Sequence, residues 1–292
     1  MRNYTRGWLK GNCPRCGKED KFGVHIGMNR ANCFYCGGYP DLKKTIMEVE
    51  GFTSNQEYYS LLAGIESTAE YKDYIPDLVY NANAELPESF SPLSMGDSQW
   101  GISARSYMEG RGFDIDDLTL AGFGYCTSGK YQGYIIMPFY MANKLVYFHA
   151  RLFLGSGPRF NNPPIEEVNI GKSLVIYNFD ALAIYKTVYI VESVLNARTI
   201  GDAAIAGGGK SFSNAQLSML VKSPVENFII ILDPDAQDKA ISMALFLQPY
   251  KKVKVICLPG EEDVNSYGKK KTINICRKNR YLSYTDILKL RK

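Results

Sequence analysis

Two short apolar runs decide the fold of this chain: FIIILDPD at residues 228–235 and VYIVES at residues 188–193, each with an acidic residue at or near its end. A third run, VKVICLPG at residues 253–260, has the same apolar character. Helical patterns separate the three runs at residues 214–222 and 238–250, because apolar residues recur there at helical spacing. Short buried strands that alternate with helices are typical of an α/β unit with a mainly parallel sheet. We predict such a unit here.

Acidic residues lie at or just after the predicted carboxyl ends of these strands. The four candidates are Glu192, Asp233, Asp235 and Asp263. Carboxyl ends of parallel strands meet at one edge of the sheet, where ligands bind in open α/β sheets. Clustered carboxylates repel one another unless cations neutralise them, and their oxygen atoms suit Mg²⁺ or Mn²⁺. The sequence therefore predicts a catalytic metal site, with isolated turn formers and helix caps as the alternative.

Two CxxC pairs near the N-terminus carry a second metal-binding pattern, CPRC at residues 13–16 and CFYC at residues 33–36. The separation of the pairs lies in the range that brings four thiolates to one tetrahedral zinc ion. We predict a small ribbon-like β module over residues 1–50 whose zinc ligands are Cys13, Cys16, Cys33 and Cys36. The alternative is four ordinary buried or redox-active cysteines.

Polar residues between the two pairs have two interpretations. They contact DNA bases or phosphates, or they form a solvated face of the module. These residues are Lys18, Lys21, His25, Asn29 and Arg30.

Composition narrows the class of protein. Hydrophobic residues make up 46% and charged residues 22% of the 292 residues, which is ordinary for a globular protein and excludes a disordered or fibrous one. The formal net charge is only +4, so a strong electrostatic grip on duplex DNA is not implied. No apolar run is long enough to span a membrane and the first residues do not form a secretory signal, so we expect a cytoplasmic protein.

The remaining sequence suggests several parts in a mixed α/β, multi-domain arrangement. Residues 41–52 have helical spacing, residues 102–112 form a predicted helix, and residues 134–141 and 145–154 form a predicted hairpin. Prolines and polar residues indicate a tether between domains. The expected order is a zinc-binding domain at 1–50, a linker at 51–98, an N-terminal subdomain at 99–185, the metal-binding unit at 186–268 and a basic C-terminal tail at 269–292. The tail ends in a predicted helix at residues 284–292.

These patterns resemble a known family. A glutamate after one strand and DxD after another resembles the Toprim module of DnaG-type primases, topoisomerases and several nucleases. The segments before it look like the ordered motifs of the primase RNA polymerase domain: SYMEGRGF, YIIMPFY, HARLF, PRFNNPP and KSLVIYN. Four cysteine ligands look more like the primase portion of bacteriophage primase-helicases than like host primases.

The resemblance implies a DNA primase, a nucleotidyltransferase that makes short RNA primers from ribonucleoside triphosphates on single-stranded DNA. It makes the four acids the expected magnesium-binding and catalytic cluster. It also implies that basic residues face template or nucleotide phosphates, namely Arg151, Arg159, Lys172 and Lys210. No P-loop occurs, so we expect a separate replicative helicase as partner.

The sequence departs from the family pattern at two places. Asn265 stands where some members have another aspartate, and Ser193 and Asn196 stand in a loop where many have glycine and a later aspartate.

Two alternative functions would use the same acidic residues. One is a Toprim nuclease that breaks phosphodiesters, and the other is a catalytically weak, nucleic-acid-binding accessory protein of the replisome.

Overall fold

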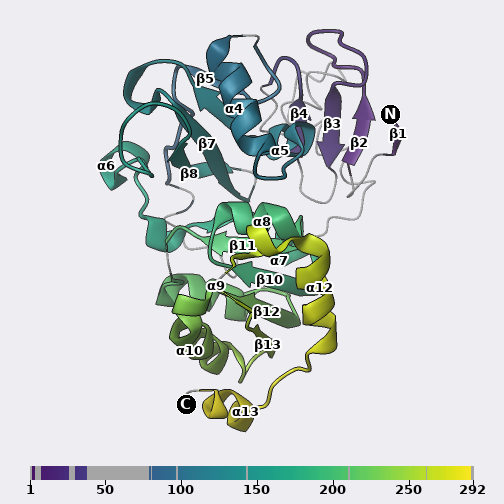
Figure 1. The fold of residues 1–292 in the computed structure, drawn as a ribbon, viewed down its shortest axis with the longest axis vertical. Helices are drawn as coiled ribbons and strands as arrows, with labels where there is room; N and C mark the ends of the chain where they lie inside the picture. The colour runs from purple at the N-terminus through teal and green to yellow at the C-terminus, as the bar shows by residue number, and fades with distance from the viewer. Residues whose placement is uncertain are drawn as a thin grey trace. The chain divides into compact units, whose positions relative to one another are not determined.

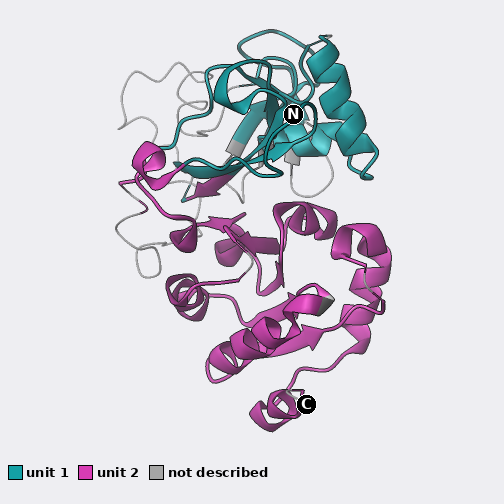
Figure 2. Cartoon of the chain, turned by 60° about the vertical axis from the view of Figure 1, so that its left-hand side comes forward, with its two compact units in different colours: residues 1–69, 84–138, 142–163 teal, residues 70–83, 139–141, 164–292 magenta. Residues whose placement is uncertain are grey.

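The chain divides into two compact units in a computed structural model (Figure 2). Unit 1 comprises residues 1–69, 84–138 and 142–163, and unit 2 comprises residues 70–83, 139–141 and 164–292. The structure describes residues 2–3, 8–25, 30–37, 79, 81–96, 98–142, 144–209, 211–260 and 262–290. The helix expected at residues 41–52 and most of the expected linker lie outside the described residues.

The first part of unit 1 is a four-stranded antiparallel sheet (Figure 1). Its strands lie in sequence order, and they are β1 (Arg2–Asn3), β2 (Trp8–Gly11), β3 (Phe22–His25) and β4 (Arg30–Cys33). Among the side chains that the structure describes in this module, the buried cluster is small and consists of Cys13, Phe22, Ala31 and Cys33. A core of this size does not stabilise a module on its own, so a metal is the expected source of stability.

A second four-stranded sheet completes unit 1, in the order β5-β6-β7-β8. All eight residues of β7 are buried, which is why the run YIIMPFYM is apolar throughout instead of alternating. Ser98 and Asp114 cap the two α-helices described in this unit with their side chains. The elements are β5 (Phe90–Pro92), α4 (Gln99–Glu109), α5 (Ile115–Leu120), β6 (Gly124–Cys126), β7 (Tyr134–Met141) and β8 (Lys144–Leu152).

Unit 2 is built on a five-stranded sheet of order β13-β12-β10-β11-β9. All strands are parallel except the edge strand β9, so the predicted mainly parallel sheet is confirmed. Helices cover both faces, and Figure 1 shows α9 and α10 on one side of the sheet and α12 on the other. The strands are β9 (Ile176–Tyr177), β10 (Thr187–Val191), β11 (Ala204–Gly207), β12 (Asn227–Ile231) and β13 (Lys252–Ile256).

The helices of unit 2 alternate with these strands. A capping box begins α9, in which the Ser213 hydroxyl accepts from the Gln216 backbone N–H and the Gln216 side chain accepts from the Ser213 backbone N–H. The long helices are α8 (Val194–Ile200), α9 (Asn214–Lys222), α10 (Gln237–Leu247), α12 (Lys269–Lys278) and α13 (Tyr284–Lys289). Short turns of helix in unit 2 are α6 (Ile165–Val168), η3 (Lys172–Leu174), α7 (Ala181–Ile184), η4 (Pro234–Ala236) and α11 (Val264–Tyr267), and unit 1 contains the short turn η2 (Gly129–Tyr131).

Two expected parts take a different form in the structure. Residues 90–92, expected in the linker, form β5 and pair with β6. Residues 269–292, expected as a basic tail that ends in a helix, contain α12 as well as the expected helix, α13, and the two helices bury Thr272, Cys276 and Ile287. These side chains pack onto unit 2, which explains why the basic segment is folded. None of the helices in the described ranges has both the length and the apolar character needed to cross a membrane.

Candidate metal centres and nucleic-acid-binding residues

The four cysteines of the two CxxC pairs converge in unit 1. Sγ of Cys13 lies 3.6 Å from Sγ of Cys36, and Sγ of Cys16 lies 3.7 Å from Sγ of Cys33. Zinc–sulfur bonds of about 2.3 Å in a tetrahedron place the sulfur atoms about 3.8 Å apart. The predicted ligands therefore have the spacing that a tetrahedral zinc ion requires.

Two similar backbone turns bring these sulfurs together. The Gly17 backbone N–H donates to Cys13 O, and the Gly37 backbone N–H donates to Cys33 O, each at 2.9 Å. Both glycines have positive φ, 69° at Gly17 and 62° at Gly37, a conformation that other residues adopt at a cost. The glycine that follows each CxxC pair thus closes the turn that presents two sulfurs to one point.

The surroundings of Cys33 suit a thiolate only when a cation is present. Backbone N–H groups of Tyr35 and Cys36 donate to Cys33 Sγ, each at 3.4 Å. Burial nevertheless raises the pKa of the Cys33 and Cys36 thiols. Zinc binding would displace the protons from these thiols, which is how metal ligation and folding are coupled in small modules.

Two of the polar candidates between the pairs are exposed, Lys18 and Lys21. Lys18 Nζ lies 4.7 Å from the ring centroid of Tyr35, whose side chain is 48% exposed. The other candidates lie outside what the structure describes, namely Asn29 and the side chains of His25 and Arg30.

The acidic candidates of unit 2 gather at the carboxyl edge of the parallel sheet. Strands β10 and β12 are neighbours, and Val191 pairs with Ile231 at their ends. Glu192 follows β10 directly and Asp233 comes two residues after β12, so their side chains meet although they are far apart in sequence. One carboxylate oxygen each from Glu192, Asp233 and Asp235 lies within 4.8 Å of the others.

This carboxylate cluster fits a divalent cation. Oxygen atoms on opposite sides of a magnesium ion are about 4 Å apart, given bond lengths of about 2.0–2.1 Å. Glu192 Oε2 and Asp233 Oδ1 are both buried and accept no hydrogen bond from any described residue. Buried carboxylate oxygens without donors are costly unless a cation or a proton satisfies them. The cluster formed by Glu192, Asp233 and Asp235 therefore has the composition and size of a cation site.

Electrostatics at Asp233 point the same way. Burial, followed by the negative charges of Glu192, Asp263 and Asp235, raises the pKa of Asp233 to about 6. The raised pKa means that three neighbouring acids and partial burial disfavour the ionised carboxylate. A divalent cation would reverse this balance, because it stabilises the ionised form.

Asp263 lies near this cluster but has a local role as well. Its carboxylate accepts a 2.8 Å hydrogen bond from the Ser266 backbone N–H and caps α11. It is not one of the three acids whose oxygen atoms converge within 4.8 Å. Its negative charge still acts on Asp233. The assignment of Asp263 as a metal ligand thus remains a prediction.

The residues that depart from the family pattern bond to one another. Asn196 is 1% exposed, and its Oδ1 accepts a 3.2 Å hydrogen bond from the Asn265 backbone N–H. Asn265 Nδ2 donates to Thr199 Oγ1 at 3.0 Å. Ser193 caps α8 through the Asn196 backbone N–H. These three residues tie α8 to α11, which holds the loops that carry Glu192 and Asp263.

Replacing Asp233 by Asn is expected to stabilise the protein at neutral pH when no divalent cation is added. The folded-state pKa of about 6 lies above the unfolded value of about 3.9, so folding favours the protonated acid. That stabilisation is complete below about pH 4 and is lost as the pH rises through about 6. The amide has no such loss, so we expect a gain of about 1–2 kcal/mol in the free energy of unfolding at pH 7.5 after discounting for solvent screening.

Urea unfolding of wild type and Asp233→Asn at pH 7.5 and pH 5, in metal-depleted buffer without a chelator, measures this gain. The zinc module stays loaded because no chelator is used. The gain should shrink from pH 7.5 to pH 5. A variant that is less stable than wild type at both pH values would contradict the described crowding of the acids.

Arg151 and Arg159, the basic candidates of unit 1, flank one aromatic ring. The motif segment PRFNN runs beside β8, because the Leu152 backbone N–H donates to Arg159 O at 3.1 Å. The guanidinium carbons of Arg151 and Arg159 lie 5.5 Å and 5.8 Å from the ring centroid of Phe160. That ring is 40% exposed. Two guanidinium groups beside a partly exposed aromatic ring are suited to bind an unpaired base and its phosphates.

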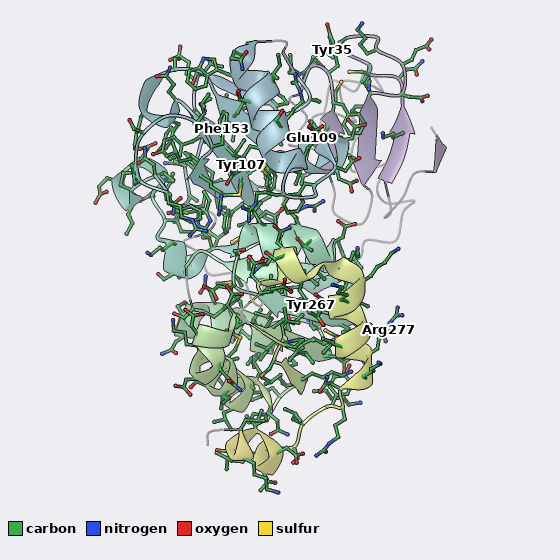
Figure 3. The ribbon with its side chains drawn as sticks, viewed as in Figure 1. Tyr35, Tyr107, Glu109, Phe153, Tyr267 and Arg277 are labelled. Atoms are coloured by element: carbon green, nitrogen blue, oxygen red, sulfur yellow. The ribbon has the colours of Figure 1, made fainter. Side chains whose placement is uncertain are left out.

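Tyr107 is a site residue that sequence reasoning missed. Arg151 Nε donates a 2.7 Å hydrogen bond to Tyr107 Oη from α4, and Tyr107 also contacts Phe153, with ring centroids 6.4 Å apart (Figure 3). Tyr107 belongs to the motif SYMEGRGF, but it is 44 residues from Arg151 in sequence. Only the tertiary fold connects the two residues.

Lys172, the basic candidate of unit 2, is exposed in η3. Its backbone carbonyl accepts a hydrogen bond from Gln216 Nε2 at 3.3 Å. A Cβ atom on Gly208 would come within 2.4 Å of that same carbonyl, so the glycine-rich string packs closely against η3. Lys210, the fourth candidate, lies outside the described residues.

Comparison by sequence finds a partial relative. Over an alignment of 113 positions that covers 36% of this chain, it is 31% identical to the DNA primase of Thermotoga maritima. The chain spans only 18% of the length of that relative. No family model matches the sequence.

Comparison by structure covers almost the whole chain. The zinc-binding and RNA polymerase domains of the Aquifex aeolicus primase superpose with a TM-score of 0.66 at 16% identity, over 96% of this chain and 81% of that one. A DnaG primase catalytic domain bound to single-stranded DNA matches 66% of this chain and 75% of its own length, with a TM-score of 0.57 at 17% identity. The E. coli primase catalytic core matches 66% of this chain and 77% of its own length, with a TM-score of 0.55 at 17% identity. The resemblance inferred from the motifs is thus confirmed at the level of the fold, which is that of the zinc-binding and RNA polymerase domains of a DnaG-type primase.

Proposed function

We propose that this chain is a DNA primase, a nucleotidyltransferase that makes short RNA primers on single-stranded DNA. The observation that carries the proposal is the cluster of Glu192, Asp233 and Asp235 at adjacent strand ends, within a primase fold that covers 96% of the chain. A cluster of carboxylates with unsatisfied buried oxygens suits metal-dependent phosphoryl transfer. The four-cysteine module in the same chain supports the proposal.

The acids would hold one or two Mg²⁺ or Mn²⁺ ions. Such ions polarise the triphosphate of the incoming nucleotide and lower the pKa of the attacking 3′-hydroxyl. Asp233 and Asp235 would be the principal ligands. Glu192 would either coordinate an ion or accept a proton, and Asp263 would complete the negative site while it caps α11.

Basic residues would hold the nucleic acid and the nucleotide. We assign Arg151 and Arg159 to template or nucleotide phosphates, because both guanidinium groups lie beside the exposed ring of Phe160. We assign Lys172 and Lys210 to phosphate binding as well, because the family resemblance of the motifs implies that role for them. The zinc module, with Cys13, Cys16, Cys33 and Cys36, would select the template and steady the first nucleotides.

One assay separates synthesis from cleavage. Single-stranded DNA labelled at its 5′ end is incubated with the four labelled ribonucleotides and Mg²⁺ or Mn²⁺. A primase yields short RNA and leaves the DNA intact, whereas a Toprim nuclease shortens the DNA. DNA binding with neither product would favour the accessory protein and contradict the proposal.

Replacing Arg151 by Ala is expected to raise the KM for template by about 10–100-fold, the cost of a lost charge-assisted hydrogen bond, with little change in kcat. Tyr107→Phe removes only the hydroxyl that orients Arg151 Nε, so we expect a rise of a few-fold, about 2–5-fold, in the same KM. Steady-state primer synthesis over a range of template concentrations measures both values. Equal KM values in wild type, Arg151→Ala and Tyr107→Phe would show that Arg151 does not contribute to template binding.

A further inference from the structure

Positive charge is concentrated at one end of the sequence. Residues 266–292 contain nine of the 34 basic residues and one of the 30 acidic residues, so they carry a formal charge of +8. Residues 1–265 carry a net charge of −4. Within this segment, α12 alone has five basic residues among its ten. The low net charge of the whole chain therefore conceals a strongly basic helix.

The basic residues of α12 form a stripe on its outer face. The helix buries Thr272 and Cys276 against unit 2. Positions 274, 277 and 278 are exposed and follow the exposed Lys270 by four, seven and eight residues. Residues at these spacings share one side of a helix. We call the basic residues at these positions the α12 stripe: Lys270, Arg277 and Lys278. Figure 3 shows Arg277 on the outer side of α12.

Contacts within the protein do not account for the α12 stripe. Of the described acidic residues, none forms an ion pair with Lys270, Arg277 or Lys278, whereas nearby Arg280 is paired with Asp286 at 2.9 Å. Lysines at the first turn of α12 also oppose the helix dipole, which favours anions at that end. Lys270 lies in that turn, so helix stability does not explain its charge.

The neighbourhood of the stripe favours a single-stranded nucleic acid as its occupant. Tyr281 follows Lys278 by three residues and is 37% exposed, so an aromatic side chain is accessible just after the end of α12. Exposed cations together with an exposed aromatic residue close in sequence are suited to track a backbone and stack an unpaired base. Ile273 and Ile275, the apolar residues of α12, are partly buried, so the helix lacks the exposed apolar face that membrane binding requires.

We propose that the α12 stripe binds the phosphate backbone of single-stranded DNA, through residues other than those of the acidic cluster and other than Arg151 and Arg159. This site deepens the proposed function, since it gives the template a second point of contact. Asn274 lies between Lys270 and Lys278 on the exposed side, where its amide can donate to a phosphate.

The test measures binding without catalysis. A fluorescently labelled 30-nucleotide single strand is titrated with protein between 50 and 300 mM salt, without nucleotides or divalent ions. The variant K270Q/R277Q/K278Q is compared with the control K186Q/K222Q/K239Q, which removes three exposed lysines of unit 2 and makes the same charge change. A charge-conserving variant, K270R/R277K/K278R, tests for rescue.

We expect the stripe variant to bind about 5–30-fold more weakly at 100 mM salt, and its plot of log affinity against log salt to be less steep by about 2, as three lost phosphate contacts require. The control should stay within about twofold of wild type with an unchanged slope. Equal weakening in stripe and control variants, or no weakening in the stripe variant, overturns the proposal. Since no nucleotide is present, these outcomes do not depend on whether the chain makes primers.

Discussion

Replacing Asp233 by Ala is expected to reduce primer synthesis by on the order of 10³-fold, while the affinity for single-stranded DNA stays within about twofold of wild type. The residue lies at the centre of the acidic cluster, with one buried oxygen that accepts no hydrogen bond from the described residues. Its removal takes away a proposed metal ligand without a change in any basic residue. Metal-dependent chemistry should therefore fail while binding persists.

Rates of ribonucleotide incorporation, measured alongside fluorescence anisotropy of labelled DNA, test this expectation. The matched control is Asp238→Ala, which removes an exposed acid from the first turn of α10, outside the cluster. The control should synthesise primers at about the wild-type rate. If Asp233→Ala retains more than a tenth of the wild-type rate, the acidic cluster is not the catalytic centre.

Cys33→Ser is expected to remove zinc and unfold the N-terminal module. Cys33 has no exposed surface and belongs to the small core with Phe22 and Ala31. Structural zinc contributes about 10–16 kcal/mol of apparent binding free energy in small modules, far more than such a core supplies. Zinc content should fall from one ion per chain to none. Initiation should fall by at least about tenfold, the equivalent of 1.4 kcal/mol, while extension of a preformed primer persists.

Cys126→Ser is the control for this loss. Cys126 is also fully buried, but it lies in the other sheet of unit 1, where burial raises its pKa to about 11. The control should keep its zinc and resist proteolysis within residues 8–25 and 30–37. Retention of a full zinc ion by Cys33→Ser would exclude Cys33 as a ligand.

The sequence predicts the parts of the fold that are locally encoded. The run YIIMPFYM gives the bounds of β7, because a strand buried on both faces is apolar throughout. NAQLSMLVK gives the bounds of α9, whose capping box requires only Ser213 and Gln216. Glu192 and Asp233 were predicted to meet because parallel neighbouring strands end at one edge.

Other features depend on tertiary contacts that leave no local signal. β5 has only three residues, one of them proline, in a polar stretch that reads as a linker. The bond from Arg151 to Tyr107 joins residues 44 positions apart, and nothing in either segment indicates it. The second role of Asp263 did have a signal, because an aspartate three residues before Ser266 at a helix start is a common N-cap.

The sequence shows that the basic residues are concentrated near the C-terminus, but only the fold shows how their side chains are arranged. Lysines at residues 269–271 suggested a solvated tail until helix formation placed Lys270, Arg277 and Lys278 on one face. A periodic stripe on a packed helix is a surface of defined shape, whereas a tail has none.

The most direct test of the central claim is initiation of RNA synthesis from two nucleotides. Ribonucleoside triphosphates labelled at the γ-phosphate are supplied with unlabelled single-stranded templates of varied sequence and Mg²⁺ or Mn²⁺. The label survives only at the 5′ end of RNA that the enzyme has started itself. A primase gives labelled RNA of a few nucleotides, complementary to the template and absent with Asp233→Ala. Incorporation of α-labelled but never γ-labelled nucleotides, or no incorporation at all, would contradict the assignment.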